Sequence, residues 1–117
     1  MNSILNAWIP KNSEVLDLGC GDGSLLASLK NKLNVSGYGV DISEKKIQLS
    51  LSKGLNVIEQ DIDEGLDNFK DASFDIVIMS QSIQALKKPE NALKEIVRIG
   101  KECIVSIPNF ANLKSVS

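Results

Sequence analysis

The chain of 117 residues contains no histidine. This absence excludes the Ser-His-Asp and Cys-His forms of nucleophilic catalysis and removes the commonest protein ligand for metal ions. Only two cysteines are present, Cys20 and Cys103, and because they fit no metal-binding spacing we expect no metal site. They also lie too far apart on the sheet predicted below to form a disulfide, which predicts free thiols.

The sequence also lacks long apolar runs and concentrated positive charge. No apolar run approaches the ~20 residues that span a bilayer, and the first residues lack the basic start and apolar core of a signal peptide. We therefore expect a cytoplasmic protein with no membrane partner. The net charge is −2 and no basic run stands out, so nucleic acid is not an expected partner. The composition, 43% hydrophobic and 24% charged, predicts one globular domain over 1–117.

Strand-like and helix-like segments alternate along the chain. Strands are predicted at 14–18, 36–42, 55–62, 74–80 and 102–107. Helices are predicted at 24–33, where leucines recur at helical spacing, from Ser43 to Gly54, and from Pro89 to Gly100. This alternation predicts an α/β fold, namely a Rossmann-like, doubly wound and mostly parallel sheet of about five strands.

Three glycines, Gly19, Gly21 and Gly23, follow the first strand in the segment EVLDLGCGDG. A turn alone needs one or two glycines, so this spacing predicts that the backbone approaches a ligand closely. In a doubly wound sheet, the turn lies at the point where strand order reverses and ligands bind. A dinucleotide fingerprint would need a glycine at position 24, where this chain has Ser24. A tight turn without a ligand is the alternative.

Asp17 completes the pattern D-x-G-x-G-x-G, which resembles motif I of class I S-adenosylmethionine-dependent methyltransferases. The cofactor of those enzymes is a cation, and an acidic residue beside the turn suits a cation better than a diphosphate. Asp41 ends the second strand, where an acidic side chain can accept both ribose hydroxyls. Asp61 and Ile62 end the third strand, where such methyltransferases bind the adenine amino group and pack an apolar residue on the ring. The alternatives are that Asp41 caps the next helix and that Asp61 is a solvated loop acid.

Other residues near this edge are interpreted more simply. Ser80 ends the fourth strand, where methyltransferases place groups near the transferred methyl, whereas Asp75 begins that strand and is interpreted as structural. Trp8 and Leu5 are expected to pack rather than to contact substrate. We expect cofactor binding by Asp17, Gly19, Cys20 (through its backbone), Gly21, Asp41, Ile42, Asp61, Ile62 and Ser80, and assign no catalytic residue.

The segments VLDLGCGDGSLL, NVIEQDIDEGL, FDIVIMSQSIQAL and IPNF together resemble the MetW family, methyltransferase-like proteins tied to bacterial methionine biosynthesis. This resemblance covers nearly the whole chain. It implies S-adenosylmethionine or S-adenosylhomocysteine as the cofactor and a role alongside homoserine O-acetyltransferase. It supplies no methyl acceptor, which would be a small molecule if the protein is an enzyme. The alternative is a non-catalytic subunit that acts with the acetyltransferase, while a nicotinamide-dependent dehydrogenase does not fit the glycine spacing.

The sequence departs from this resemblance after IPNF, where it continues as ANLKSVS. Members of the family normally continue further, so the resemblance implies that the C-terminal part of the fold is missing. The predicted strand at 102–107 would then be an unprotected sheet edge. Exposed edges favour self-association, so this one predicts a homodimer or docking of the acetyltransferase through Cys103 to Ile107.

Overall fold

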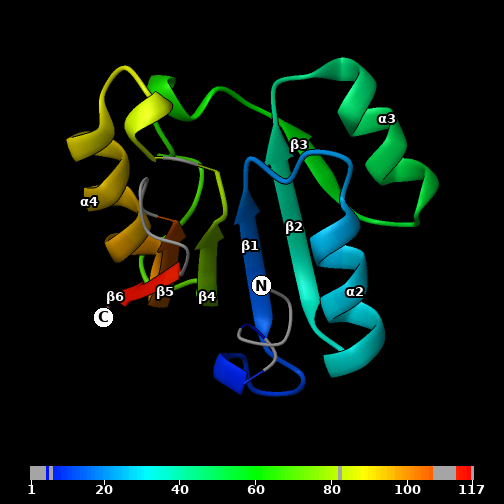
Figure 1. The fold of residues 1–117 in the computed structure, drawn as a ribbon. Helices are drawn as coiled ribbons and strands as arrows, with labels where there is room; N and C mark the ends of the chain where they lie inside the picture. The colour runs from blue at the N-terminus through cyan, green and yellow to red at the C-terminus, as the bar shows by residue number, and fades with distance from the viewer. Residues whose placement is uncertain (1–4, 6, 82, 107–112, 117) are drawn as a thin grey trace.

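The computed structural model describes residues 5, 7–81, 83–106 and 113–116. One sheet of six strands in the order β3-β2-β1-β4-β5-β6 runs through the molecule (Figure 1). The strands are β1 Glu14–Leu18, β2 Ser36–Asp41, β3 Val57–Glu59, β4 Phe74–Met79, β5 Gly100–Ser106 and β6 Leu113–Val116. The helices are α2 Ser24–Leu33, α3 Glu44–Ser52 and α4 Pro89–Ile99, with the short 3-10 turns η1 Ile62–Glu64 and η2 Ile83–Ala85. None of the helices described is long and apolar enough to cross a membrane.

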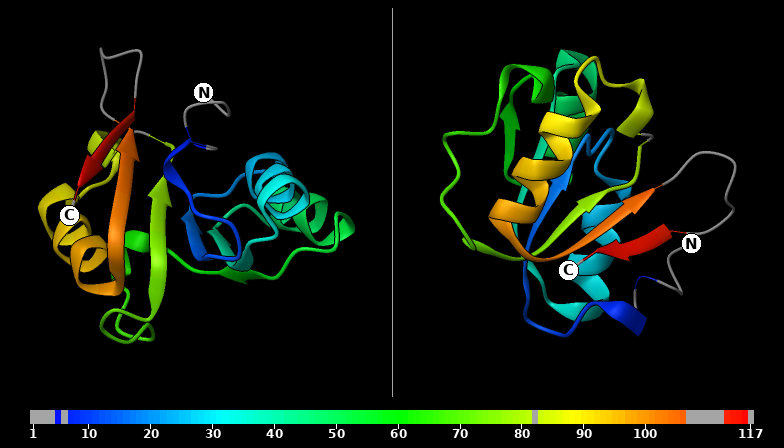
Figure 2. Two further views of the ribbon diagram at one scale, coloured as in Figure 1. Left: turned by 90° about the horizontal axis from the view of Figure 1, so that it is seen from below. Right: turned by 90° about the vertical axis from the view of Figure 1, so that its left-hand side faces the viewer.

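The sheet is doubly wound, as the sequence predicts. Strands β1 to β5 are parallel and β6 pairs antiparallel with β5. Strand order reverses at β1, because β2 and β3 extend the sheet on one side of it and β4 and β5 on the other. Helices α2 and α3 cover one face and α4 covers the other (Figure 2). Ligands of such sheets bind outside the carboxyl ends of the strands at this reversal, so a ligand site is expected there.

Two apolar clusters fill the two faces of the sheet. Because side chains alternate along a strand, Val15 packs with the leucines of α2, whereas Leu16 and Leu18 pack with Ile96 and Ile99 of α4. Strand β4 is buried on both faces, which agrees with its continuous apolar sequence. The first strand therefore lies inside the core, and the turn that follows it emerges at the carboxyl edge.

Two predicted features are wrong. Strand β3 covers Val57–Glu59 rather than 55–62. It ends early because the Asp61 side chain accepts a hydrogen bond from the Asp63 N–H at 2.9 Å and begins η1. Strand β5 is not an unprotected edge, because β6 pairs with it from Cys103 to Ser106. The reason for expecting a homodimer through β5 is thereby removed. Ile107, the IPNF segment and Ser82 lie outside the described residues.

Arg98 of α4 anchors the polar loop that links η1 to β4. Its guanidinium donates to the backbone oxygens of Leu66 and Phe69 at 3.0 and 2.8 Å. It also donates to the carboxylates of Glu95 and Asp71, and the hydrogen bonds from Arg98 hold the pKa of Glu95 below its ordinary value. Asp75 is structural, as predicted, since it accepts from the Glu14 N–H at 2.8 Å. These bonds fix the loop before β4 and join the starts of β1 and β4.

Gly39 of β2 packs closely against Cys20 of the turn after β1, and this contact can be tested. A Cβ at Gly39 would lie 2.6 Å from the Cys20 sulfur and 2.8 Å from its Cβ. We expect Gly39→Ala to lower the free energy of unfolding by about 1–3 kcal/mol, the usual cost of overpacking, in urea denaturation. In a Cys20→Gly background, which removes both contacting atoms, the same substitution should cost much less. An equal cost in both backgrounds would contradict this packing.

Candidate cofactor site

The glycine turn between β1 and α2 has an open position and a packed one. Gly19, Gly21 and Gly23 have φ of +73°, +59° and +82°, a region that other residues rarely adopt. A Cβ at Gly23 would lie 2.6 Å from the Leu55 side chain, whereas a Cβ at Gly21 would meet no atom within 4 Å. Gly23 therefore permits packing against the segment after α3, while Gly21 leaves open space beside the backbone.

Asp41, at the end of β2, holds this turn in place. One carboxylate oxygen accepts a hydrogen bond from the Gly21 N–H at 2.8 Å, and the other accepts from the Ser43 N–H at 2.9 Å. Ser43, rather than Asp41, caps α3, because its hydroxyl accepts from the Lys46 N–H. A carboxylate has about four acceptor positions, so the two hydrogen bonds use only part of the acceptor capacity of Asp41.

Asp17 is buried without a hydrogen bond. It faces the α2 side of the sheet, like Val15 two residues earlier, and only 1% of it is exposed. Neither carboxylate oxygen has a hydrogen-bond partner in the described part of the chain. Burial, with a further contribution from the Asp41 charge, raises the pKa of Asp17 to about 7. Burial likewise raises the pKa of the Cys20 thiol to about 11, so the thiol stays neutral. The first turn therefore covers an unpaired acid.

Ser50 of α3 and Lys53, the C-cap residue of that helix, also hold the turn, and the sequence does not single them out. The buried Ser50 hydroxyl donates to the Gly21 carbonyl at 2.9 Å, and the Lys53 ammonium donates to the Asp22 carbonyl at 2.8 Å. Ser50 follows Ile47 by one helical turn, so spacing alone indicates an inward position. Nothing in the sequence indicates its partner.

The other predicted residues lie along the same edge but differ in exposure. Ile42 is 63% exposed and offers apolar surface beside Asp41. Asp61 is half-buried and caps η1, so it is not merely a solvated loop acid. Ile62 packs partly against the apolar cluster on the α4 side. Ser80 directly follows β4. Asp41 and Asp61 thus have local structural roles that use only some of their acceptor positions.

A cavity of about 630 Å³ lies at this edge. It is lined by Gly19, Cys20, Gly21, Asp22, Ser24, Leu25, Lys45, Lys46, Leu49, Ser80 and Gln81. Residues from the turn, α2, α3 and the end of β4 therefore meet in one space. Among the predicted site residues, the glycines Gly19 and Gly21, together with Cys20 and Ser80, line it. Asp17 and the predicted residues at the ends of β2 and β3 do not.

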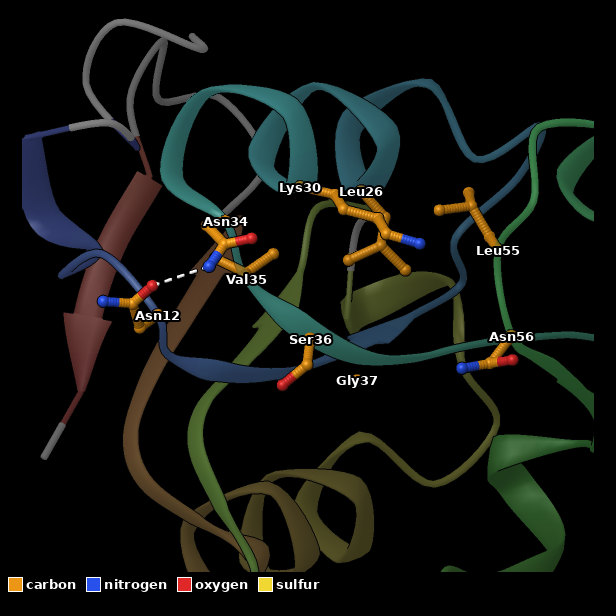
Figure 3. A pocket seen from close by; sticks show the side chains of 9 residues that line it. All are labelled: Asn12, Leu26, Lys30, Asn34, Val35, Ser36, Gly37, Leu55 and Asn56. Atoms are coloured by element: carbon orange, nitrogen blue, oxygen red, sulfur yellow. Dashed lines mark hydrogen bonds between the residues drawn. The ribbon is translucent and has the colours of Figure 1, made fainter.

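A second cavity, of about 400 Å³, lies near the amino ends of β2 and β3, opposite the carboxyl ends (Figure 3). It is bounded by α2, the start of β2 and the loop before β3, and Asn34 donates to the Asn12 side chain at 2.8 Å on its rim. None of the predicted site residues lines it. Because ligands of doubly wound sheets bind at the carboxyl ends of the strands, we place the candidate site at the first cavity.

Solved structures with this fold define the class of protein. A methyltransferase from Mesorhizobium loti, dependent on S-adenosylmethionine, matches with a TM-score of 0.78 at 19% identity, covering 90% of this chain and 51% of that one. Another S-adenosylmethionine-dependent methyltransferase, from Thermotoga maritima, matches with a TM-score of 0.74 at 30% identity, covering 89% of this chain and 48% of that one. The chain has the Rossmann-like fold of class I S-adenosylmethionine-dependent methyltransferases.

Sequence comparisons give the particular family. The family model described as "Methionine biosynthesis protein MetW" matches residues 2–116. A bifunctional methionine biosynthesis protein MetXA/MetW from Rhodopirellula baltica is 37% identical over 111 residues. This chain belongs to the MetW family, a methyltransferase-like family named for methionine biosynthesis. The match covers 88% of this chain but 18% of the Rhodopirellula protein, so the chain spans a small part of that relative.

The unpaired Asp17 carboxylate predicts a cost to stability that depends on pH. The pKa of Asp17 is about 7 in the folded chain, against an ordinary value of 3.8. The folded chain therefore holds this proton more tightly than the unfolded chain does. The resulting contribution to stability is fully present below pH 3.8 and is lost as pH rises to about 7. Asp17→Asn removes this titration. We expect the stability of the variant relative to wild type to rise by about 1–3 kcal/mol from about pH 5 to about pH 8 in urea denaturation.

Asp75→Asn is the matched control for this experiment. Hydrogen bonding from the Glu14 N–H holds the pKa of Asp75 below its ordinary value, so Asp75 does not titrate between about pH 5 and about pH 8. The stability of the Asp75→Asn variant relative to wild type should therefore stay constant over that interval. A constant difference for Asp17→Asn as well would show that this carboxyl group does not titrate there.

Proposed function

We propose that this chain binds S-adenosylmethionine, or its demethylated product S-adenosylhomocysteine, at the carboxyl ends of β1, β2 and β3. The observation that carries the proposal is Asp17, a buried carboxylate with no hydrogen-bond partner among the described residues and with Asp41 nearby. A buried acid of this kind is costly unless a positive charge compensates it. No lysine or arginine in the described residues contributes to its pKa, so we infer that a cationic ligand in the adjoining cavity, which Gly19 and Cys20 line, would compensate its charge.

The neighbouring residues fit the rest of such a ligand. The open space beside Gly21 would admit the ligand to the backbone of the turn. The remaining acceptor positions of Asp41 would take the ribose hydroxyls. The adenine ring would lie between the exposed Ile42 and Ile62, with its amino group donating to Asp61. In this proposal, Gly19 and Cys20 contribute their backbone.

The chain's own contribution to a reaction would be positioning. When bound, S-adenosylmethionine supplies a reactive methyl group on a sulfonium, so the protein needs to hold donor and acceptor in line. Ser80 lies in the cavity at the end of β4, where it would face the methyl group and orient an acceptor. Because the relatives named above are much longer than this chain, methyl transfer by the whole protein is part of the proposal.

Substitution of Gly21 tests cofactor binding directly. Gly21→Ala would place a methyl group in the open space, so we expect binding of S-adenosylhomocysteine, measured by calorimetry, to weaken at least about tenfold. Gly54→Ala is the matched control, because Gly54 also has a positive φ and no atom within 4 Å of an added Cβ. Both variants should lose about 1–2 kcal/mol of stability from the left-handed conformation. Equal affinity in the two variants, or no binding by the wild-type chain, would refute the proposed function.

We also propose a second role, in which the chain acts together with homoserine O-acetyltransferase. Its support is the Rhodopirellula relative, a single protein named as both MetXA and MetW, together with membership of the MetW family. Two activities joined in one chain are held at high effective concentration, which is useful when they also associate as separate chains. This role does not require methyl transfer. A non-catalytic subunit could therefore perform it.

Co-expression tests this second role. We expect the chain to co-purify with homoserine O-acetyltransferase from the same organism and to change its acetylation rate when added to the purified enzyme. Gly21→Ala separates the roles, because it should block the cofactor and leave a purely structural association unchanged. Separate elution of the two proteins in size-exclusion chromatography, with no change in acetylation rate, would show that this second role is wrong.

A further inference from the structure

Asp63 of η1 joins two loops at the carboxyl edge of the sheet. One of its carboxylate oxygens accepts a hydrogen bond from the Lys88 N–H at 3.0 Å, and the other accepts from the Lys87 N–H at 3.1 Å. Lys88 is the N-cap residue of α4, and Pro89 begins the helix. One side chain from the loop after β3 therefore holds the end of the loop after β4, where the chain enters α4.

The same 3-10 turn is fixed at its other end by Asp61. The Asp61 carboxylate accepts from the Asp63 N–H at 2.9 Å, so Asp63 donates to one neighbour and accepts from two others. Ile62 lies between the two acids and packs partly against the α4-side cluster, as do Ile83 and Leu86 from the loop after β4. The two loops therefore share both a polar clamp and an apolar support.

The charge of Asp63 strengthens this clamp. Hydrogen bonds from the Lys87 and Lys88 amides hold the pKa of Asp63 below its ordinary value, and the lysine charges act in the same direction. The carboxylate therefore stays ionised at neutral pH, beside the positive end of the α4 dipole. Hydrogen bonds to an ionised acceptor are about twice as strong as neutral ones. An amide in its place would offer one acceptor and turn an N–H group toward a backbone N–H.

We propose that Asp63 is a positioning residue that fixes the adenine-side loop, Asp61 and Ile62, to the segment 83–88 that follows β4. A ligand that contacts the adenine-side loop thereby orders the segment 83–88 as well. The inference rests on the proposed function and deepens it. The ligand class it concerns is an adenosyl compound, recognised at its adenine end. The segment after β4 leads away from Ser80, so ordering it would shape the acceptor side of the same site.

Asp63→Asn tests the clamp through two measurements on the 117-residue chain. Calorimetry gives the affinity for S-adenosylhomocysteine, and hydrogen exchange by NMR gives the protection of the Lys87 and Lys88 amides with and without that ligand. In the wild type we expect the ligand to slow exchange at both amides. In Asp63→Asn we expect affinity to fall by about three- to thirtyfold and the ligand-induced protection to disappear. Asp67→Asn, an exposed acid of the same loop, is the control and should behave as wild type.

The two measurements separate positioning from a purely structural role. Loss of a helix cap alone would speed exchange equally with and without ligand and leave the ligand-induced difference intact, and that result would overturn the inference. Asp63→Ser keeps one acceptor and should give intermediate values, and it decides the question if circular dichroism shows that Asp63→Asn is unfolded. Binding by the wild type with unchanged affinity in these variants refutes the clamp alone. No binding by the wild type refutes the proposed function and the clamp with it.

Discussion

The two hydrogen bonds that the Asp41 carboxylate accepts join the ends of two neighbouring strands. Through the Gly21 N–H it fixes the turn after β1, and through the Ser43 N–H it fixes the start of α3. Ser50 then returns from α3 to the Gly21 carbonyl, so the turn is held from both sides. Hydrogen bonds to the Gly21 backbone fix the turn, so no side chain is needed at that position. Glycine there permits the left-handed conformation and leaves the space beside the backbone open.

This arrangement has an electrostatic consequence at Asp17. Closing the turn over the end of β1 buries the Asp17 carboxyl while Asp41 supplies a like charge to it. Burial and like charge both oppose ionisation, and no hydrogen bond from the described residues offsets them. A sequence selected only for stability would place an apolar residue here, as it does at Val15 on the same face. The acid is therefore consistent with the proposed ligand, which would compensate its charge.

The extent to which the sequence predicts the structure differs between local and tertiary features. The bounds of β1 and α2 follow from apolar runs and leucine spacing, because those signals are local. The third strand is predicted but is shorter than expected, since Asp61 turns the chain through a side-chain hydrogen bond that the apolar pattern does not reveal. The pairing of β6 with β5 depends on a contact between separate segments. The roles of Ser50 and Asp63 are likewise tertiary, because their partners lie on other elements of the fold.

One local hydrogen-bonding arrangement recurs at this edge and shows that a turn role and a ligand role are compatible for Asp41 and Asp61. Asp22, Asp41 and Asp61 each accept a hydrogen bond at 2.9 Å from the backbone N–H two residues later, an arrangement that turns the chain sharply. Capping a turn uses only part of a carboxylate's acceptor capacity, so a turn residue can also be a ligand residue. Asp17 differs, because it lies within β1 and has no turn to cap. Its cost is therefore not offset locally, and the proposed cationic ligand is the compensation that we infer for it.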